Sequence, residues 1–126
     1  MRLAVAQTVA TVSGDARFAP GLAVPEVWRC LVEVGRAAGG DAVAMGAVAA
    51  AIRNISQAGV GAAGLDTAAM GEVRDVLVAI CRAAEGGAVV ACAATAVANL
   101  TQWPEGQAMM ARDEVRDVLV AMGRVA

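Results

Sequence analysis

The sequence predicts an all-α protein built as an α-solenoid of stacked helical units, and three observations lead to this fold class. The octapeptide EVRDVLVA stands at Glu72–Ala79 and again at Glu114–Ala121, 42 residues later. An eroded copy, EVWRCLVE, begins at Glu26, 46 residues before the middle one. Repeats with periods in the low forties are typical of helical solenoids, in which each unit is too small to bury its own apolar face.

Composition supports this prediction and excludes several classes of function. The 126 residues are 59% hydrophobic but only 2% aromatic, a balance that favours helices packed closely through small side chains. All ten basic residues are arginine, the net charge is −2, and the two signs alternate along the chain. Because nucleic-acid binding requires a basic patch, we expect no nucleic-acid partner.

Each predicted unit has three helical segments, which we name H1, H2 and H3. H3 is a strongly apolar helix that ends in one of three similar segments, here called the closing blocks: VATVSG at 9–14, IRNISQ at 52–57 and VANLTQ at 97–102. Short polar side chains can bond loose backbone groups at helix ends, so each block is expected to end a helix. A glycine pair precedes each of the two complete H3 segments, at 39–40 and 86–87.

H1 and H2 lie between a closing block and the next glycine pair. H1 is the short segment DARFAPGLA, GVGAAGLDTAAM or PEGQAMMAR, in which prolines and glycines limit helix length. H2 is amphipathic and begins at a glutamate, which suits the positive end of a helix. In the middle copy its apolar residues recur at i, i+3, i+4 and i+7, namely Val73, Val76, Leu77 and Ile80. H2 is expected to start after Pro25, Gly71 and Asp113.

These segments divide the chain into four parts within one domain. Residues 1–14 form a partial repeat that ends in H3, 15–57 and 58–102 form two complete repeats, and 103–126 contain H1 and H2 only. The last H2 therefore has no H3 after it to cover its apolar side. We expect its stripe to be an end interface, made of Val115, Val118, Leu119 and Met122.

A three-helix unit of this length, with H3 ending in Asn-Ile-Ser or Asn-Leu-Thr, resembles the armadillo repeat family. The residues that carry the resemblance are Ala51–Ser56 and Ala96–Thr101. The resemblance implies a right-handed solenoid whose H3 helices line a concave groove for an extended peptide. Two-helix HEAT repeats have a similar length and an equally apolar inner helix, and they are the alternative.

In armadillo proteins an asparagine near the end of H3 binds the backbone of the peptide. The resemblance therefore implicates Asn54 and Asn99, with Thr11 in the first, degraded copy; helix capping is the alternative role for both asparagines. One turn earlier, where importins carry a tryptophan, this chain has Gln7, Ala50 and Thr95, so basic nuclear-localisation peptides are not the expected ligand. Arg53 is a candidate contact for an acidic ligand, or a solvated side chain.

Catalytic and metal-binding chemistry is not expected. The chain has no histidine or lysine, and its two serines, Ser13 and Ser56, both lie in closing blocks. The three cysteines (Cys30, Cys81, Cys92) have no metal-ligand spacing, so we expect neither a metal nor another cofactor. The uncharged run at 86–104 approaches membrane-spanning length, but it contains polar residues and belongs to the repeat, so no membrane association is expected.

Two functions follow from this reading. The first is a non-enzymatic protein–protein interaction module that binds an extended peptide or a partner surface along the H3 groove. The second is a structural self-assembly unit that forms a homo-oligomer through its uncapped ends, or a fragment of a larger repeat scaffold. We expect a cytoplasmic location, with the nucleus as the alternative.

Overall fold

The computed structural model describes residues 2–39, 41–57, 67–84 and 87–125, and this part of the chain is all-helical. Its elements, in order, are α1 (Arg2–Ser13), the 3₁₀ turn η1 (Ala19–Leu22), α2 (Pro25–Ala37), α3 (Ala42–Gln57), α4 (Thr67–Ala83), α5 (Gly87–Leu100), α6 (Pro104–Met110) and α7 (Asp113–Val125). The all-α prediction is confirmed.

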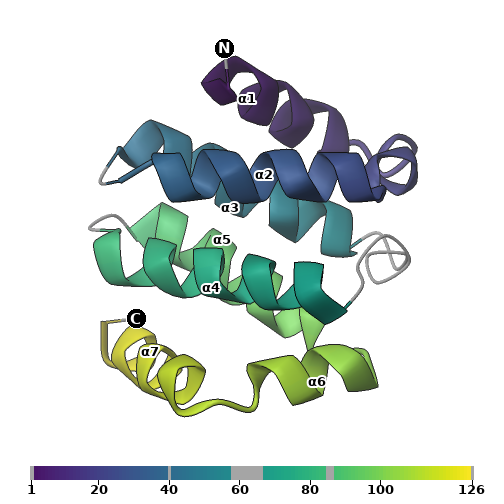
Figure 1. Cartoon of the computed structure of the whole chain (residues 1–126). Coiled ribbons are helices and arrows are strands. Elements are labelled where there is room, and N and C mark those ends of the chain that lie inside the picture. Colours follow the sequence, from purple (N-terminus) through teal and green to yellow (C-terminus); the bar gives the residue numbers. More distant parts are fainter. Residues whose placement is uncertain (1, 40, 58–66, 85–86, 126) are drawn as a thin grey trace.

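The helices form two layers that run the length of the molecule (Figure 1). In one layer α3 packs against α1 on one side and α5 on the other. In the other layer α4 packs between α2 and α7. The layers meet where α3 packs on α2 and α5 on α4, and α1 and α7 lie at opposite ends of the molecule.

Local sequence explains where the helices begin. α2 has Pro25 in its first turn, where the missing N–H costs nothing, and Glu26 beside it complements the helix dipole. Asp41 caps α3, because its Oδ1 accepts hydrogen bonds from the backbone N–H groups of Val43 (2.9 Å) and Ala44 (3.3 Å). Before this cap, Gly39 has a φ of +56°, a conformation that favours glycine.

Local sequence also explains where the apolar helices end. α1, α3 and α5 end at Ser13, Gln57 and Leu100, within the three closing blocks, as predicted. The closing-block hydroxyls bond carbonyls of their own helices, which otherwise lose partners at a helix end.

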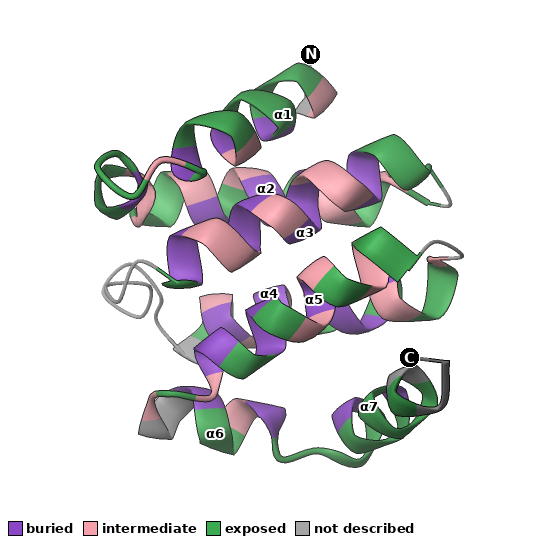
Figure 2. Cartoon of the chain, turned by 180° about the vertical axis from the view of Figure 1, so that it is seen from behind, coloured by how far each residue is buried: buried purple, intermediate pink, exposed green. Residues whose placement is uncertain are grey.

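The core fills the space between the two layers. Its largest fully buried side chains include Trp28, Leu31, Ile52, Ile55 and Leu77. The predicted H2 stripe of the middle copy is buried in full, at no more than 3% exposure for any of its four residues. Figure 2 shows that α3, which has a neighbour on each side, is buried over much of its surface.

Two predicted H1 segments differ from the structure. The first folds only as the four-residue turn η1, because Pro20 and the glycine after it limit the helix. In the middle copy α4 starts at Thr67 and runs through Gly71, where a helix start was predicted; residues 58–66 lie outside the described part of the chain. Met70 is 2% exposed, so packing of this extra turn outweighs the weak helix propensity of glycine.

Candidate interaction surface

The candidate site lies on the outer side of α1, α3 and α5, here called the α1–α3–α5 surface. Gln7 and Thr11 of α1 and Thr95 of α5 are exposed, whereas Arg53 and Asn54 of α3 are half-buried between them. These predicted site residues therefore come from three neighbouring helices of one layer. Asn99 is the exception, because it is only 8% exposed.

The two asparagines make the same contact in successive helix pairs. Asn54 Nδ2 donates a hydrogen bond to the carbonyl of Ala10 in α1 (3.2 Å), and Asn99 Nδ2 donates to the carbonyl of Arg53 in α3 (3.1 Å). Asn99 Nδ2 also donates to Ser56 Oγ (3.2 Å). Both amides thus join one apolar helix to the one before it, and this contact was not among the roles expected from the sequence.

In each closing block, a hydroxyl lies within hydrogen-bond distance of the carbonyl of the block's second residue. Ser13 Oγ donates to Ala10 O (3.2 Å) and Thr101 Oγ1 to Ala98 O (2.7 Å). Ser56 Oγ lies within hydrogen-bond distance of Arg53 O (3.0 Å) and also of Ile52 O (2.6 Å), and its one proton is shared between these two carbonyls. The first two carbonyls also accept the asparagine of the following helix. Each junction between apolar helices therefore contains one carbonyl with two donors, one local and one from the neighbour.

Arg53 has an unusual environment for a cation. Its Nε and Nη2 donate to Asn54 Oδ1 (3.1 and 3.0 Å), and its Nη1 lies 3.0 Å from Cys92 Sγ of α5. Among the side chains that the structure describes, no carboxylate lies within ion-pair distance of this guanidinium. Cys92 was not among the predicted site residues, because it lies 39 residues from Arg53 in the chain.

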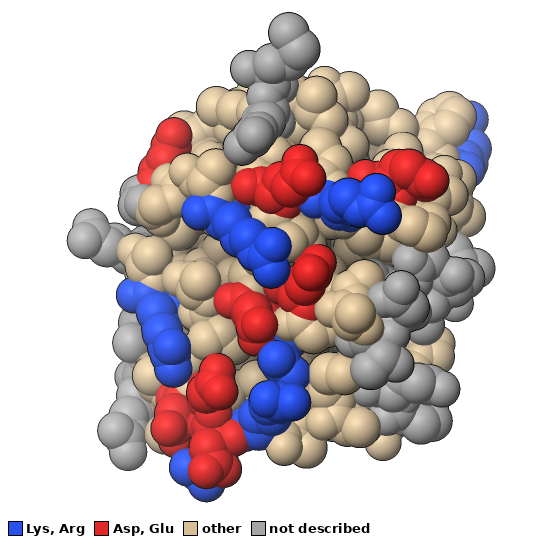
Figure 3. Space-filling model, viewed as in Figure 1, with Lys and Arg blue, Asp and Glu red and all other residues tan. Residues whose placement is uncertain are grey.

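Charge is concentrated on the opposite face of the molecule. Figure 3 shows acidic and basic side chains interleaved over the layer of α2, α4 and α7. On α1, α3 and α5, by contrast, Arg53 is the one charged residue whose side chain is described. Among the described side chains of these three helices, Arg53 is therefore a half-buried cation surrounded by uncharged residues.

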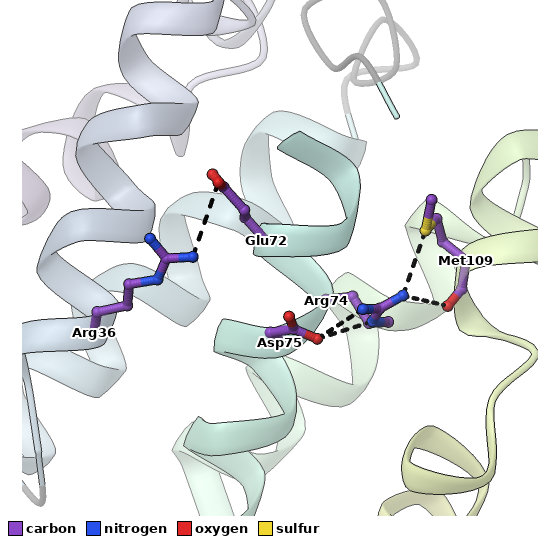
Figure 4. Close-up of polar contacts among 5 residues, drawn as sticks. All are labelled: Arg36, Glu72, Arg74, Asp75 and Met109. Atoms are coloured by element: carbon purple, nitrogen blue, oxygen red, sulfur yellow. Dashed lines mark hydrogen bonds and ion pairs between the residues drawn. The ribbon is translucent and has the colours of Figure 1, made fainter. Parts of the chain in front are cut away.

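Two polar contacts of the charged face join neighbouring helices (Figure 4). Arg36 of α2 pairs with Glu72 of α4 at 3.9 Å, across two exposed side chains. Arg74, 8% exposed, pairs with Asp75 (2.9 Å), and its Nη1 donates to the carbonyl of Met109 in α6 (3.4 Å). Both arginines thus have a carboxylate partner, whereas Arg53 is bonded, among the described residues, only by an amide oxygen and a cysteine sulfur.

The expected end interface on α7 needs a correction. Val115 and Val118 are 2% and 8% exposed and belong to the core, so the expectation that they lie uncovered is wrong. α7 packs against both α4 and α5, and this packing covers them. Leu119 remains exposed at 43%, and Val120, which the sequence reading omitted, is exposed at 48%. The side chain of Met122 lies outside the described part.

The described residues show neither a metal-binding cluster nor a membrane-spanning helix. Within the described ranges, no cluster of three or more histidine, cysteine, aspartate or glutamate side chains could hold a metal ion. None of the helices in these ranges combines the length and apolarity needed to cross a membrane. Burial raises the pKa of the Cys81 thiol above its ordinary value, which disfavours the reactive thiolate.

Comparisons with protein-family models, with curated proteins and with solved structures gave no match.

Proposed function

We propose that this chain is an armadillo-type α-solenoid that acts as a non-enzymatic protein–protein interaction module. Two features support the solenoid. Apolar helices α1, α3 and α5 lie side by side in one layer, and the same asparagine-to-carbonyl bond joins each to the next. Regular side-by-side stacking of this kind produces the extended surfaces that solenoid proteins use for binding.

The ligand that we propose is an extended peptide segment with an acidic side chain, lying across the α1–α3–α5 surface. The observation that carries this proposal is Arg53, a half-buried cation without a described carboxylate partner, on helices whose other described side chains are uncharged. Asn54 Oδ1 fixes the orientation of its guanidinium, and the cysteine sulfur beside it is a weak acceptor that a carboxylate can replace. A charge-assisted hydrogen bond at this position would contribute about 1.5–3 kcal/mol.

Two exposed polar residues support binding of peptide backbone on either side of Arg53. Gln7 and Thr95 occupy corresponding positions of α1 and α5, and Ala50 lies between them on α3. An amide and a hydroxyl can each bond a peptide group of an extended ligand. The proposal places recognition on Arg53, Gln7 and Thr95, because the amides of Asn54 and Asn99 already bond the preceding helix.

A display library of random peptides, selected on the immobilised protein, tests this function. We expect the selected peptides to be enriched in aspartate and glutamate. Arg53→Glu should weaken the binding of a selected peptide at least tenfold, which corresponds to about 1.4 kcal/mol. The matched control is Arg116→Glu, because Arg116 is an exposed arginine of the charged face. Selection of peptides without acidic residues, or equal binding to the Arg53→Glu protein, would contradict the proposal.

A further inference from the structure

Helix α3 shows how an apolar helix of this protein is covered when it has a neighbour on each side. Val48, Ala51 and Ile55 form one of its stripes and are fully buried, at 0% exposure. The corresponding positions of α1 are Val5, Thr8 and Val12, and all three are exposed, the two valines at 41% and 38%. α1 therefore presents an apolar stripe that its equivalent in the middle of the molecule buries completely.

At the other end of the molecule, α7 exposes apolar side chains whose counterparts on α2 and α4 are buried. Leu31 of α2 and Leu77 of α4 are buried, at 0% and 1% exposure, but the corresponding Leu119 of α7 is 43% exposed. The next position repeats the contrast, because Val32 and Val78 are buried whereas Val120 is 48% exposed. α2 and α4 are each packed by the apolar helix that follows them, and α7 has no such neighbour among the described residues.

The side of α5 that faces away from α3 adds to this second exposed surface. Met45, Ala49 and Ser56 of α3 are buried, whereas their counterparts on α5 are only half-buried; these are Val90, Ala94 and Thr101. Leu119 and Val120 also line an open hollow of about 410 Å³ beside α7, together with residues 110–113 and Arg116 and without any residue of α5. Of the seven large hydrophobic side chains exposed in the described part, four lie on α1 and α7.

The repeated carbonyl contact identifies what would fit there. Ala10 O and Arg53 O each accept a closing-block hydroxyl and the asparagine of the next apolar helix. Ala98 O accepts the hydroxyl of Thr101, but no described side chain supplies the second donor. Ala98 O therefore lies at the position where the other two carbonyls contact the apolar helix that follows.

We infer that α1 of a second copy of this chain packs on α5 and α7 of the first. Its exposed stripe of Val5, Thr8 and Val12 would take the place that Val48, Ala51 and Ile55 of α3 have inside the molecule. Thr11, which corresponds to Asn54, would face the carbonyl of Ala98. The contact joins two different surfaces, so in a pair of copies each copy still has one surface free. Further copies can therefore add head to tail and form a ring or a filament.

This inference is independent of the proposed peptide ligand, which uses the outer side of the same helices. A second copy is favoured over an unrelated partner because the contact would repeat the two packings, α1 on α3 and α3 on α5, that the molecule already makes. The stripe residues Val5, Thr8 and Val12 carry no charge, so these three side chains can be buried without desolvating an ion.

Two double variants test the inference, each altered on exposed residues so that the fold is retained. The α1 variant contains Val5→Arg and Val12→Arg, and the α7 variant contains Leu119→Arg and Val120→Arg. Sedimentation velocity of the whole chain should show wild-type protein growing beyond a monomer between low and high micromolar concentration. Each variant should remain a monomer, while the control Val43→Arg should assemble as wild type does, because Val43 is 57% exposed away from both ends.

A mixture of the two variants shows whether the contact is head to tail or symmetric. Each variant retains one intact surface, so the equimolar mixture should form a one-to-one dimer and nothing larger. A wild-type protein that stays monomeric at high micromolar concentration would overturn the inference, as would a mixture that stays monomeric. Variants that still dimerise on their own would also overturn it, because that behaviour requires a symmetric contact.

A gain-of-function variant tests the register. Thr11→Asn places an asparagine at the position of α1 that corresponds to Asn54 of α3. The new amide would donate a hydrogen bond to Ala98 O of the neighbouring copy. We expect association roughly fivefold tighter, as for one added hydrogen bond. An unchanged association constant would overturn the register assigned here.

Discussion

Replacing Asn99 by alanine tests whether its amide joins α5 to α3. The substitution removes two hydrogen bonds, from Nδ2 to Arg53 O (3.1 Å) and to Ser56 Oγ (3.2 Å), at a site only 8% exposed. Each such bond contributes about 0.5–1.5 kcal/mol, so we expect the free energy of unfolding to fall by about 2 kcal/mol. With an m-value of about 1.5 kcal/mol/M, the urea midpoint followed by circular dichroism should fall by about 1 M.

Two further substitutions make this result interpretable. Asn54→Ala removes one bond to the preceding helix and two that Oδ1 accepts from the adjacent Arg53. The site is half-buried and the freed guanidinium can bond water, so the loss should be smaller, about 1 kcal/mol. Thr95→Ala is the control, because its exposed hydroxyl bonds only the carbonyl of Ala91 in its own helix, and we expect a change within about 0.5 kcal/mol. Equal stability of the Asn99→Ala and Thr95→Ala proteins would refute the reasoning, and would return Asn99 to the role of a ligand contact.

Three other predictions concern packing and thiol chemistry. Gly35→Ala should lower the free energy of unfolding in urea by about 1–2 kcal/mol, because the new Cβ would overlap the stiff side chain of Val76. Gly46→Ala should raise it by about 0.5–1 kcal/mol, because the new Cβ would make only ordinary contacts. Trp28→Phe should change stability by less than about 1 kcal/mol, since the buried Nε1 has no acceptor among the described residues, and Trp28→Ala should cost about 3–5 kcal/mol. Because burial raises the pKa of Cys81, its thiolate forms at higher pH than in an unfolded chain; alkylation followed by mass spectrometry should be slower in the native protein, and urea should abolish the difference.

Helix type and most helix ends could be predicted because they depend on neighbouring residues. The 3.6-residue spacing of the H2 stripe and the short polar residues of the closing blocks both act within one helix. The start of α4 could not be predicted in this way. Gly71 is a local stop signal, but the turn before it is held by burial of Met70, which depends on parts of the chain distant in sequence.

The candidate site was predictable in its positions but not in its contacts. Sequence alignment of the copies placed Asn54 and Asn99 at the ends of apolar helices, and left helix capping and peptide binding as alternatives. The structure shows a third arrangement, in which each amide donates a hydrogen bond to a carbonyl of the preceding apolar helix. Likewise, burial of Val115 and Val118 comes from α4 and α5, which a reading of α7 alone could not include.

The repeated carbonyl contact explains why the closing blocks combine an asparagine with a hydroxyl residue. The hydroxyl donates to the carbonyl one turn back in its own helix, and the asparagine donates to the equivalent carbonyl of the helix before it. In α1 a threonine stands in place of the asparagine, and Thr11 Oγ1 bonds Gln7 O of its own helix (2.9 Å). A contact made by α1 with another copy would therefore lack the asparagine bond of the internal junctions. It follows that assembly should dissociate on dilution or at low urea, well before the junctions within one copy open.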